Sequence, residues 1–586
     1  MDKNFKIFRY IRKYWILALG SVLFMIAEVS ADLYQPGMMR IIVDFGVLGL
    51  DNNGTPDINL VLQIGLKMML IVFLGGFCGV MCGVLSNLCG QNFGNDIRKD
   101  CFRKIMHFSF AQTDKFSSGS LITRITSDVT LTQNMIQQLM RGFVRCMMFL
   151  FAGSYALVSM DADYRIVILA AVPLIVLNIM LVLWKASPLF DVLQRALDKI
   201  NAAVQENIAG ARVVKAFGQE EREIQRFNAK NREYMDIQRR VLILLSMMRP
   251  SMNIILNCAV VAVIKIGAFS VQNGSAAPGV VMAAVTYLTQ ILNGMLMLAM
   301  LFQNITRGVA SARRLDEILV TEPDIKDGAG KFTILPPERG HVKFRNVSFA
   351  YPSGRGMVLH DINLEIKAGE TLAIIGETGC GKTSLVNLIP RFYDVSGGCV
   401  EVGGHDVRDY KLSELRERIA VVFQKSELFS STIRENIAMG NPLADFPEIE
   451  EAARSAQAEE FILKCPQGYE TKLSEAGMSL SGGQRQRIAI ARALLKLKKA
   501  DVLILDDATS ALDFKTEAAV QEALKTRYMD VTKIIIAVRI MSVRNADRIA
   551  VIEDGTVTAC DTHERLLATS AAYARIYESQ MKDTVK

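Results

Sequence analysis

The sequence is poor in the residues that bind structural metals, and its cysteines do not form the pattern of a cross-linked domain. It contains five histidines and ten cysteines, and none of their spacings is typical of a zinc site. Cys78 and Cys82 lie one helical turn apart within an apolar run, and four other cysteines lie in the more polar second half. We interpret the cysteines as reduced thiols in a membrane or the cytosol, rather than as a disulfide framework.

The chain also lacks a strong excess of charge and a cleavable export signal. Its formal net charge of +7 arises in connecting segments and not in a continuous basic stripe, so no nucleic-acid partner is predicted. The segment 1–14 is basic, but the apolar run after it has no small-residue cleavage site and is interrupted by Glu28 and Asp32. We therefore predict an interfacial N-terminal helix that leads into a membrane span.

Long apolar stretches fill the first part of the chain, whereas the rest has the composition of a soluble α/β domain. The length of 586 residues indicates two to four domains. Six segments are long enough to cross a bilayer: 15–33, 61–89, 143–160, 166–184, 243–271 and 278–301. The sequence therefore predicts a multi-pass protein in contact with a lipid bilayer.

The charges of the connecting segments predict the orientation of these spans. Residues 44–57 include acids and no lysine or arginine, whereas 96–128 and 185–240 are long and rich in both basic residues. By the positive-inside rule, both termini and both long connections are cytoplasmic. The compact chain, without an N-terminal extension, is expected to lie in a bacterial cytoplasmic membrane.

Apolar residues recur at helical spacing within the second long connection, at Leu197, Ile200, Val204 and Ile208. This pattern predicts membrane helices that continue well beyond the bilayer. Short transverse helices are expected where the chain bends, around 117–132 and 211–221. Independent cytoplasmic coiled coils are the alternative.

Two features within the spans point to packing and to transport. Gly75, Gly79 and Gly83 repeat every four residues, which favours close contact between helices rather than a role in binding substrate. Glu28 and Asp32 share one face of the first span, where a carboxylate needs a partner or a polar cavity. They are candidates for the path of a polar or cationic substrate, although pairing near the membrane boundary is an alternative.

The most informative motif lies between residues 371 and 388, TLAIIGETGCGKTSLVNL. A buried strand, a glycine-rich turn and a helix follow one another, and Gly376, Gly381, Lys382 and Thr383 fit the phosphate-binding loop pattern G-x-x-x-x-G-K-[ST]. Lys382 is expected to reach the β- and γ-phosphates of ATP, and the Thr383 hydroxyl to bind Mg²⁺. The residues expected to bind ATP are Gly376, Glu377, Thr378, Gly379, Cys380, Gly381, Lys382, Thr383 and Ser384.

Two further motifs follow this loop and carry a family resemblance. LSGGQ occupies 480–484, and the strand VLILDD ends at Asp506, which is expected to help hold Mg²⁺. With these motifs the chain resembles an ATP-binding cassette (ABC) exporter half-transporter, in which six spans are fused to one nucleotide-binding domain. The resemblance covers essentially the whole chain, and the spacing of LSGGQ between the loop and the acidic strand is highly specific.

The resemblance implies further roles for residues outside the phosphate loop. Tyr351 would stack on adenine, Gln424 would contact Mg²⁺ and respond to the membrane domain, and Glu475 would lie in an exporter-type cross-linking loop. The loop 510–513, SALD, would communicate across a dimer. The residues expected to complete the ATP site of a partner subunit are Ser481, Gly482, Gly483 and Gln484.

Two positions depart from the family pattern. Asp507 stands where the family has a glutamate that acts as general base, and its side chain is about 1.5 Å shorter. Val538 stands where the family has a histidine that contacts the γ-phosphate, and valine can neither donate a hydrogen bond nor carry charge. With LSGGQ intact, the two departures resemble the degenerate-site subunit of heterodimeric exporters.

The sequence therefore predicts a six-span α-helical membrane domain, 1–306, a linker, 307–339, and an α/β nucleotide-binding domain, 340–586. The expected function is ATP- and Mg²⁺-dependent export of hydrophobic or amphipathic small molecules, as half of a heterodimer. The alternatives are an importer or lipid flippase of the same fold, a homodimer with two poor sites, and a regulator that does not transport.

Overall fold

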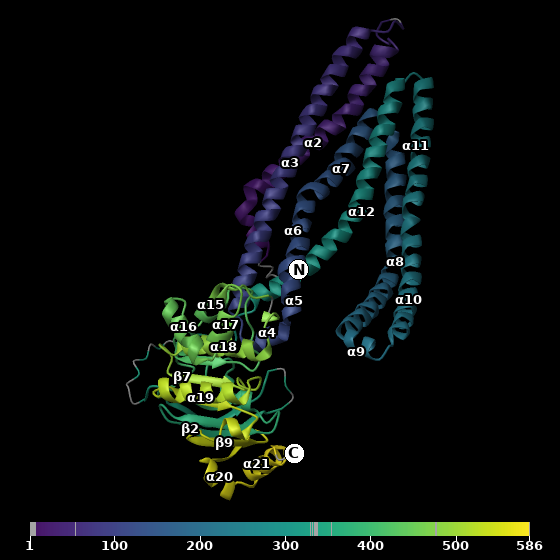
Figure 1. Cartoon of the computed structure of the whole chain (residues 1–586). Helices are drawn as coiled ribbons and strands as arrows, with labels where there is room; N and C mark the ends of the chain where they lie inside the picture. Colours follow the sequence, from purple (N-terminus) through teal and green to yellow (C-terminus); the bar gives the residue numbers. More distant parts are fainter. Residues whose placement is uncertain are drawn as a thin grey trace. The chain divides into compact units, whose positions relative to one another are not determined.

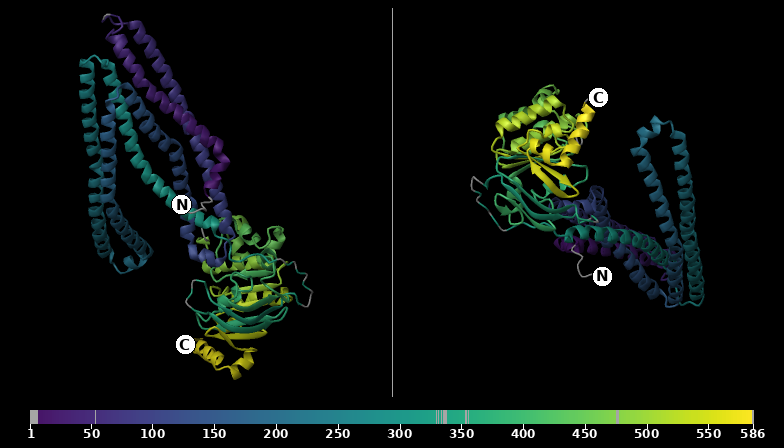
Figure 2. Two further views of the ribbon diagram at one scale, coloured as in Figure 1. Left: turned by 180° about the vertical axis from the view of Figure 1, so that it is seen from behind. Right: turned by 90° about the horizontal axis from the view of Figure 1, so that it is seen from below.

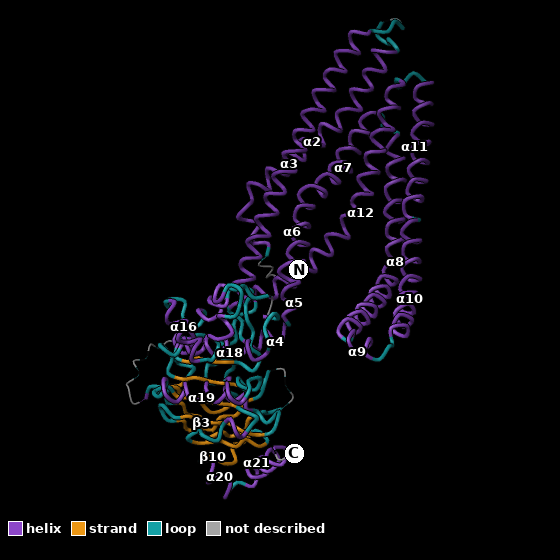
Figure 3. Tube along the Cα trace, viewed as in Figure 1, coloured by secondary structure: helices purple, strands orange, loops and turns teal. Residues whose placement is uncertain are grey.

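The computed structural model describes residues 7–52, 54–328, 330, 332, 334, 338–352, 354, 356–474 and 477–584, so Glu475 lies outside the described residues. The chain divides into two compact units. The first comprises the residues up to Met106 together with Gly119–Thr321, and the second comprises His107–Ser118 together with the chain from Glu322 onward. Helices make up the first unit, and strands gather in the second (Figures 1 and 3).

The first unit is a set of long helices and contains the predicted membrane spans. Within the described residues, six helical runs are long and apolar enough to cross a membrane, as predicted. The helices are α1 (Phe8–Ile11), α2 (Trp15–Ile41), α3 (Ile58–Met106), α5 (Ser118–Thr123), α6 (Val129–Gln138), α7 (Val144–Met160), α8 (Tyr164–Ala209), α9 (Ala211–Ala216), α10 (Glu220–Ser246), α11 (Met248–Gln272) and α12 (Pro278–Val320).

Several of these helices are much longer than a bilayer is thick. Helix α3 has 49 residues, about 74 Å of helix, against a hydrocarbon core of about 30 Å. Helices α8 and α10 lie side by side and are joined by the short helix α9, as two views of the chain show (Figures 1 and 2). The prediction of helices that extend beyond the membrane, with a short helix after residue 211, is thus confirmed.

The first predicted short helix is placed differently. Residues 118–160 form one nearly continuous helical run, in which the π-helical turns η3 (Arg124–Asp128) and η4 (Leu139–Phe143) join α5, α6 and α7. The expected transverse helix at 117–132 is therefore wrong, and the separate short helix is α4 (Phe110–Phe116), which belongs to the second unit. A capping box starts α4, and the left-handed backbone of Ser117 (φ +54°) ends it.

Two of the three repeated glycines of α3, Gly75 and Gly79, lie against α2, whereas Gly83 faces the Arg141 guanidinium group. A Cβ atom on Gly75 would lie 3.1 Å from the Cβ of Ala31, and one on Gly79 would lie 3.0 Å from the carboxylate of Glu28. A larger residue at Gly75 would push the two helices apart, whereas one at Gly79 would displace the Glu28 carboxylate. These glycines therefore permit close packing, and Gly79 makes room for a charged side chain.

The second unit contains two sheets, which are orange in Figure 3. A four-stranded antiparallel sheet has the order β2-β1-β4-β5, and a six-stranded sheet has the order β10-β9-β3-β8-β7-β6, with β9, β3, β8, β7 and β6 parallel. The strands are β1 (Val342–Phe349), β2 (Leu359–Ile366), β3 (Thr371–Gly376), β4 (Gly397–Val402), β5 (His405–Asp406), β6 (Ile419–Val422), β7 (Val502–Asp506), β8 (Thr532–Ile536), β9 (Arg548–Glu553) and β10 (Thr556–Asp561).

The parallel sheet is buried on both faces, because its central strands read as continuous apolar runs. Every residue of β7 is buried, and the four central residues of β3 are buried as well. The helices of this unit are α13 (Lys382–Asn387), α14 (Leu412–Glu417), α15 (Ile433–Ala438), α16 (Phe446–Ser455), α17 (Glu459–Leu463), α18 (Gly482–Lys496), α19 (Phe514–Arg527), α20 (His563–Thr569) and α21 (Ala571–Thr584). The carboxyl ends of β3, β6, β7 and β8 lie at one edge, where a ligand site is expected.

Candidate nucleotide site and membrane ion cluster

The phosphate loop joins β3 to α13 and depends on its glycines. Gly379 and Gly381 have left-handed backbones, with φ of +90° and +101°, which favour glycine. A Cβ atom on Gly376 would lie 2.3 Å from the carbonyl oxygen of Ile552 on the neighbouring strand. The Lys382 ammonium group donates hydrogen bonds to loop carbonyls, at 2.9 Å from that of Gly376 and 2.7 Å from that of Glu377. The loop thus holds its own cation at its centre.

A hydroxyl and a buried carboxylate meet beside this loop. The Thr383 hydroxyl, in the first turn of α13, donates a hydrogen bond of 3.1 Å to Asp506 at the end of β7. Asp506 is only 4% exposed, and burial raises the pKa of its carboxyl group, while the hydrogen bond from Thr383 lowers it. Both groups offer oxygen ligands, which suit Mg²⁺. A cation here would balance a charge that the protein leaves partly uncompensated.

Gln424 and Asp507 lie at the ends of the neighbouring strands β6 and β7. The Gln424 amide nitrogen lies 3.5 Å from a carboxylate oxygen of Asp507, at the limit of a hydrogen bond. The backbone of Asp507 is left-handed, with φ of +49°, a conformation that aspartate tolerates better than most residues. The sequence analysis did not anticipate this backbone conformation.

Val538 follows β8 and faces the same site. Its side chain is 53% exposed and lines the pocket at the strand ends. The backbone carbonyl of Val538 accepts a hydrogen bond of 2.7 Å from Gln580 of α21, which fixes the segment from outside the pocket. All five histidines of the chain lie within the described residues, and none of them lines this pocket.

The pocket has a volume of about 420 Å³ and brings most of the predicted residues together. Gly376, Glu377 and Cys380 form the loop without lining the cavity, and Val358 and Ile536 are lining residues that the sequence analysis missed. The predicted residues that line it are Tyr351, Thr378, Gly379, Gly381, Lys382, Thr383, Ser384, Gln424, Asp506, Asp507 and Val538.

The ring of Tyr351 is held in place at the mouth of the pocket by other aromatic residues. Its hydroxyl group forms a 2.8 Å hydrogen bond with the Ser384 hydroxyl, so one tyrosine links the pocket wall to the phosphate loop. The ring meets Phe349 and Tyr393 edge to face, at centroid distances of 4.8 and 5.1 Å. Phe349 lies two residues before Tyr351, whereas Tyr393 comes from the segment that follows α13, and neither carries a motif that could have identified it.

Helix α4 packs onto the second unit close to this aromatic group. Phe110 contacts Phe392 at a centroid distance of 4.4 Å, and the Tyr393 hydroxyl donates a 3.0 Å hydrogen bond to Asp114. Burial raises the pKa of the Tyr393 phenol, and the hydrogen bond to Asp114 raises it further. A segment that follows the second membrane helix in sequence therefore packs beside the residues that support Tyr351.

Comparison with known proteins identifies the family. The profile of the ABC transporter transmembrane region matches residues 18–295, and the ABC transporter profile matches residues 359–510. The chain is 36% identical over 575 residues to the ABC transporter ATP-binding protein YfiB of Bacillus subtilis (strain 168), with 98% of each chain covered. It belongs to the ABC transporter family.

A second relative and a solved structure place the transporter among the exporters. It is 36% identical over 520 residues to an ATP-dependent lipid A-core flippase of Syntrophus aciditrophicus (strain SB), covering 89% of this chain and 86% of the flippase. The structure of a bacterial Atm1-family ABC exporter with ATP bound matches with a TM-score of 0.80 and 27% identity, over 97% of this chain and 98% of the other. The chain is thus a multi-pass ABC exporter of a bacterial membrane, and such exporters act as dimers.

The LSGGQ motif of this exporter starts a helix and lies apart from the pocket described above. The Ser481 side chain accepts a hydrogen bond from the backbone of Gln484, whose side chain accepts one in return from the Ser481 backbone at 2.9 Å. Ser481 and Gly482 are exposed, and a Cβ atom on Gly483 would lie 2.8 Å from the Ala511 carbonyl oxygen. The motif therefore presents an open helix N-terminus, which suits an anionic ligand.

In the first unit, the two carboxylates predicted for a substrate path have a basic partner. Arg145 of α7 lies 3.3 Å from Glu28 and 3.4 Å from Asp32, both on α2. The side chains of Arg145 and Asp32 remain 36% and 33% exposed, and that of Glu28 is 17% exposed. This ion cluster has one net negative charge. Arg145 was missed in the sequence because it lies at the edge of the third span, where an arginine is ordinary.

Proposed function

We propose that the chain is one half of a heterodimeric exporter of hydrophobic or amphipathic compounds, and that its own ATP site binds nucleotide with little hydrolysis. In this arrangement both termini and the nucleotide-binding unit are cytoplasmic. The LSGGQ segment of this chain completes the hydrolytic site of the partner subunit, whereas the pocket around Lys382 forms the weak site.

The observation that carries the proposal is that Asp507 and Val538 line one pocket together with Lys382, Thr383 and Asp506. The groups that hold phosphate and Mg²⁺ are present, whereas the two that would act on the attacking water and the γ-phosphate are replaced. An error of about 1 Å in placing a catalytic group lowers a rate on the order of a hundredfold. A shorter carboxylate and an apolar valine in one site therefore favour binding over hydrolysis.

Each of the remaining residues has a definite task at this site. The loop amides and Lys382 bind the phosphates, Tyr351 orients the adenine, and Thr383, Gln424 and Asp506 would hold Mg²⁺. Mg²⁺, when bound, neutralises negative charge on the phosphate oxygens. Asp507 can still orient a water molecule, but it does so from a shorter side chain.

ATP hydrolysis by the purified heterodimer tests this assignment. Asp507→Ala is expected to leave the turnover rate nearly unchanged, whereas removal of the partner subunit's catalytic carboxylate should abolish it. Asp554→Ala is a matched control, because Asp554 is also an aspartate with a left-handed backbone, φ of +44°, and lies outside the pocket. Equal loss of activity from the two catalytic changes would contradict an asymmetric pair of sites.

Native mass spectrometry of the complex from its host separates the heterodimer from the homodimer. The heterodimer predicts one copy of this 64.9 kDa chain with one different half-transporter. A mass of two copies would leave two sites without glutamate or histidine, and would favour the non-transporting regulator. Uptake of an amphipathic dye into inverted membrane vesicles tests the export of such compounds, and ATP-dependent lipid translocation assays test the flippase function that the Syntrophus aciditrophicus relative carries in its name.

The ion cluster of Glu28, Asp32 and Arg145 supports a path for cationic amphipathic compounds. Its single excess negative charge, held between α2 and α7, would attract a cation and repel an anion. Glu28→Gln should weaken the transport of a cationic dye while leaving a neutral dye unaffected. Loss of transport of both dyes would instead assign the cluster to helix packing.

A further inference from the structure

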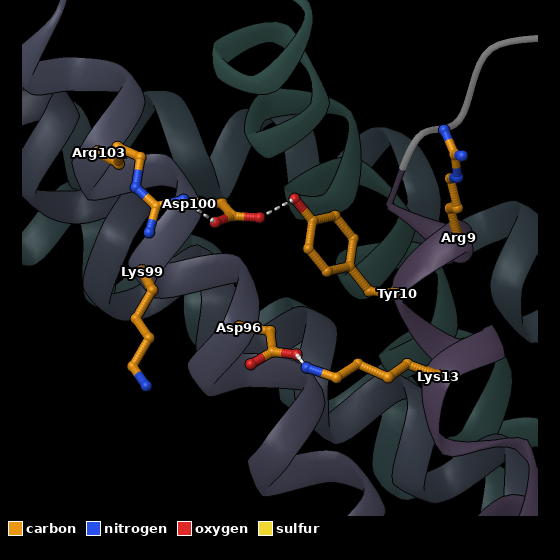
Figure 4. A pocket seen from close by; sticks show the side chains of 7 residues that line it. All are labelled: Arg9, Tyr10, Lys13, Asp96, Lys99, Asp100 and Arg103. Carbon is orange, nitrogen blue, oxygen red and sulfur yellow. Dashed lines mark hydrogen bonds and ion pairs between the residues drawn. The ribbon is translucent and has the colours of Figure 1, made fainter.

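The N-terminal helix packs on the last turns of α3, and a pocket of about 490 Å³ lies between them (Figure 4). This N-terminal pocket is distinct from the nucleotide site and from the ion cluster within the membrane unit. Its charged lining comprises four basic residues, Arg9, Lys13, Lys99 and Arg103, and two acidic ones, Asp96 and Asp100.

The pocket is built by fixed contacts between the two helices. The Tyr10 hydroxyl donates a 2.7 Å hydrogen bond to Asp100, and the Lys13 ammonium group lies 2.8 Å from Asp96. Figure 4 shows these two side chains crossing from the N-terminal helix to α3. Ile7, which precedes them, is fully buried. The N-terminal helix is therefore held on α3 instead of moving freely along the membrane surface.

Both carboxylates of the pocket, those of Asp96 and Asp100, take part in these contacts, and the pocket retains an excess of positive charge. Arg103 also lies beside Asp100, at 3.3 Å. Arg9 and Lys99 are exposed, and neither has a carboxylate within 4.0 Å among the described residues. Figure 4 shows no dashed line at the side chain of Arg9 or of Lys99. The pocket thus has two more positive than negative groups, and a ligand that balances them must be an anion.

The pocket lies beyond the closely spaced exposed apolar residues of α2 and α3, on the side where polar residues become frequent. On α2 the exposed apolar surface begins with Trp15, which is 58% exposed and lies two residues after Lys13. On α3 the closely spaced exposed apolar residues end with Leu88, which is 48% exposed; exposed polar residues such as Asn95 and Lys99 follow, and Phe102 and Met106 are exposed apolar residues further along the helix. Tryptophan at such a boundary is typical of the membrane interface. The surrounding anions at that level are the phosphate groups of lipids.

We propose that the N-terminal pocket binds the phosphate of an anionic phospholipid headgroup, with Arg9 and Lys99 as its main charged contacts. The acyl chains of such a lipid would lie along the exposed apolar surface that starts at Trp15. Arginine and lysine bind phosphate by charge-assisted hydrogen bonds, and each basic group near an anionic membrane contributes about fivefold in affinity. Free phosphate offers the same chemistry without the chains, so the two sources can be separated by experiment.

The chain provides its own reporter for this test. It has two tryptophans, Trp15 beside the pocket and Trp184 on α8, which is 74% exposed. In the variant Trp184→Phe, the fluorescence of Trp15 reports lipid contact, because brominated acyl chains quench tryptophan at short range. The full chain is reconstituted in phosphatidylcholine vesicles that contain a small fraction of either brominated phosphatidylglycerol or brominated phosphatidylcholine.

Quenching of Trp15 by brominated phosphatidylglycerol is expected to exceed that by brominated phosphatidylcholine. Removing both free cations by Arg9→Gln and Lys99→Gln should lower this preference about 25-fold, or abolish it if it is smaller than that. Both residues are exposed, so the variant should unfold at the same temperature as the parent chain. Equal quenching by the two lipids in the parent chain, or an unchanged preference in the variant, would overturn the proposal.

Two controls identify the source of the anion and the location of the site. Lys185→Gln removes an exposed lysine next to Trp184, outside the pocket, and should leave the Trp15 preference unchanged. Inorganic phosphate added at tens of millimolar should also leave the Trp15 preference unchanged. Complete loss of that preference would assign the pocket to a soluble anion. Because neither readout depends on ATP, failure here is distinct from failure of the proposed asymmetric ATPase.

Discussion

In the proposed asymmetric transporter, restoring the two replaced groups should turn the weak ATP site into a hydrolytic one. The changes are Asp507→Glu and Val538→His, singly and together. Glutamate extends the carboxylate by one methylene, about 1.5 Å, toward the position where a general base acts. Histidine replaces a half-exposed valine in the pocket wall and supplies a donor for the γ-phosphate.

The structure allows the size of the gain to be worked out. Correcting a misplacement of about 1 Å is worth on the order of a hundredfold. The left-handed backbone at Asp507, φ of +49°, disfavours glutamate by about 1 kcal/mol, which is about fivefold. Asp507→Glu alone should therefore accelerate hydrolysis about 20-fold. A donor to the phosphate adds about a hundredfold, so the double variant should gain on the order of a thousandfold.

Single-turnover hydrolysis is the appropriate assay, in a complex whose partner subunit lacks its catalytic carboxylate. Only the site around Lys382 can then cleave ATP. Asp554→Glu serves as the control, since it lengthens an aspartate with the same left-handed backbone outside the pocket. If the double variant binds ATP as the parent does and hydrolyses it no faster, the identity of these two side chains does not explain the weak site.

Three further changes test other parts of the second unit. Gly483→Ala should weaken hydrolysis at the partner's site at least tenfold, because the new Cβ would lie 2.8 Å from the Ala511 carbonyl oxygen. Gly482→Ala should have only a mild effect, because its Cβ meets an ordinary 3.7 Å contact. Both effects are measured as ATPase turnover. Asp506→Asn should abolish stabilisation by Mg²⁺ and ATP but raise the unfolding free energy without nucleotide by about 0.5–2 kcal/mol. Burial raises the pKa of Asp506, so its ionised form opposes folding. The stability gained by Asp506→Asn should therefore grow as the pH rises through that pKa and vanish in acid. Urea titrations at several pH values measure this dependence. Phe110→Ala should lower the free energy of unfolding by about 1–2 kcal/mol because it removes an aromatic contact, and nucleotide affinity should be unchanged.

The parts of this transporter that were predictable from sequence are those set by local pattern. Apolar length marks the six spans, and the glycine positions of the phosphate loop follow from the steric needs of one turn. Lys382, Thr383 and Asp506 meet because parallel strands end at one edge of a sheet. Each of these features depends on residues close in sequence or on a general rule of sheet topology.

The features missed depend on contacts between distant segments. Tyr393 supports Tyr351 from a segment beyond the phosphate loop, and no spacing in the sequence relates the two residues. A short helix was expected around residues 117–132, at a bend of the long helices, whereas Ser109 and its capping box start the short helix at Phe110. Arg145 carried no signal by itself, and its role becomes visible only when α7 packs against α2.

The two departures from the family pattern affect only one of the two tasks of an ATP site. Groups expected to hold ATP in its ground state, such as Lys382 and Thr383, are retained, and in the proposed mechanism they would contact phosphates before and during the reaction alike. Asp507 and Val538 replace groups that act mainly as the reaction proceeds, on the attacking water and on the γ-phosphate. Interactions made only in the transition state set the rate, whereas uniform interactions set affinity. Random loss of function would strike both classes, so damage confined to one class argues that this site is kept for tight binding of ATP.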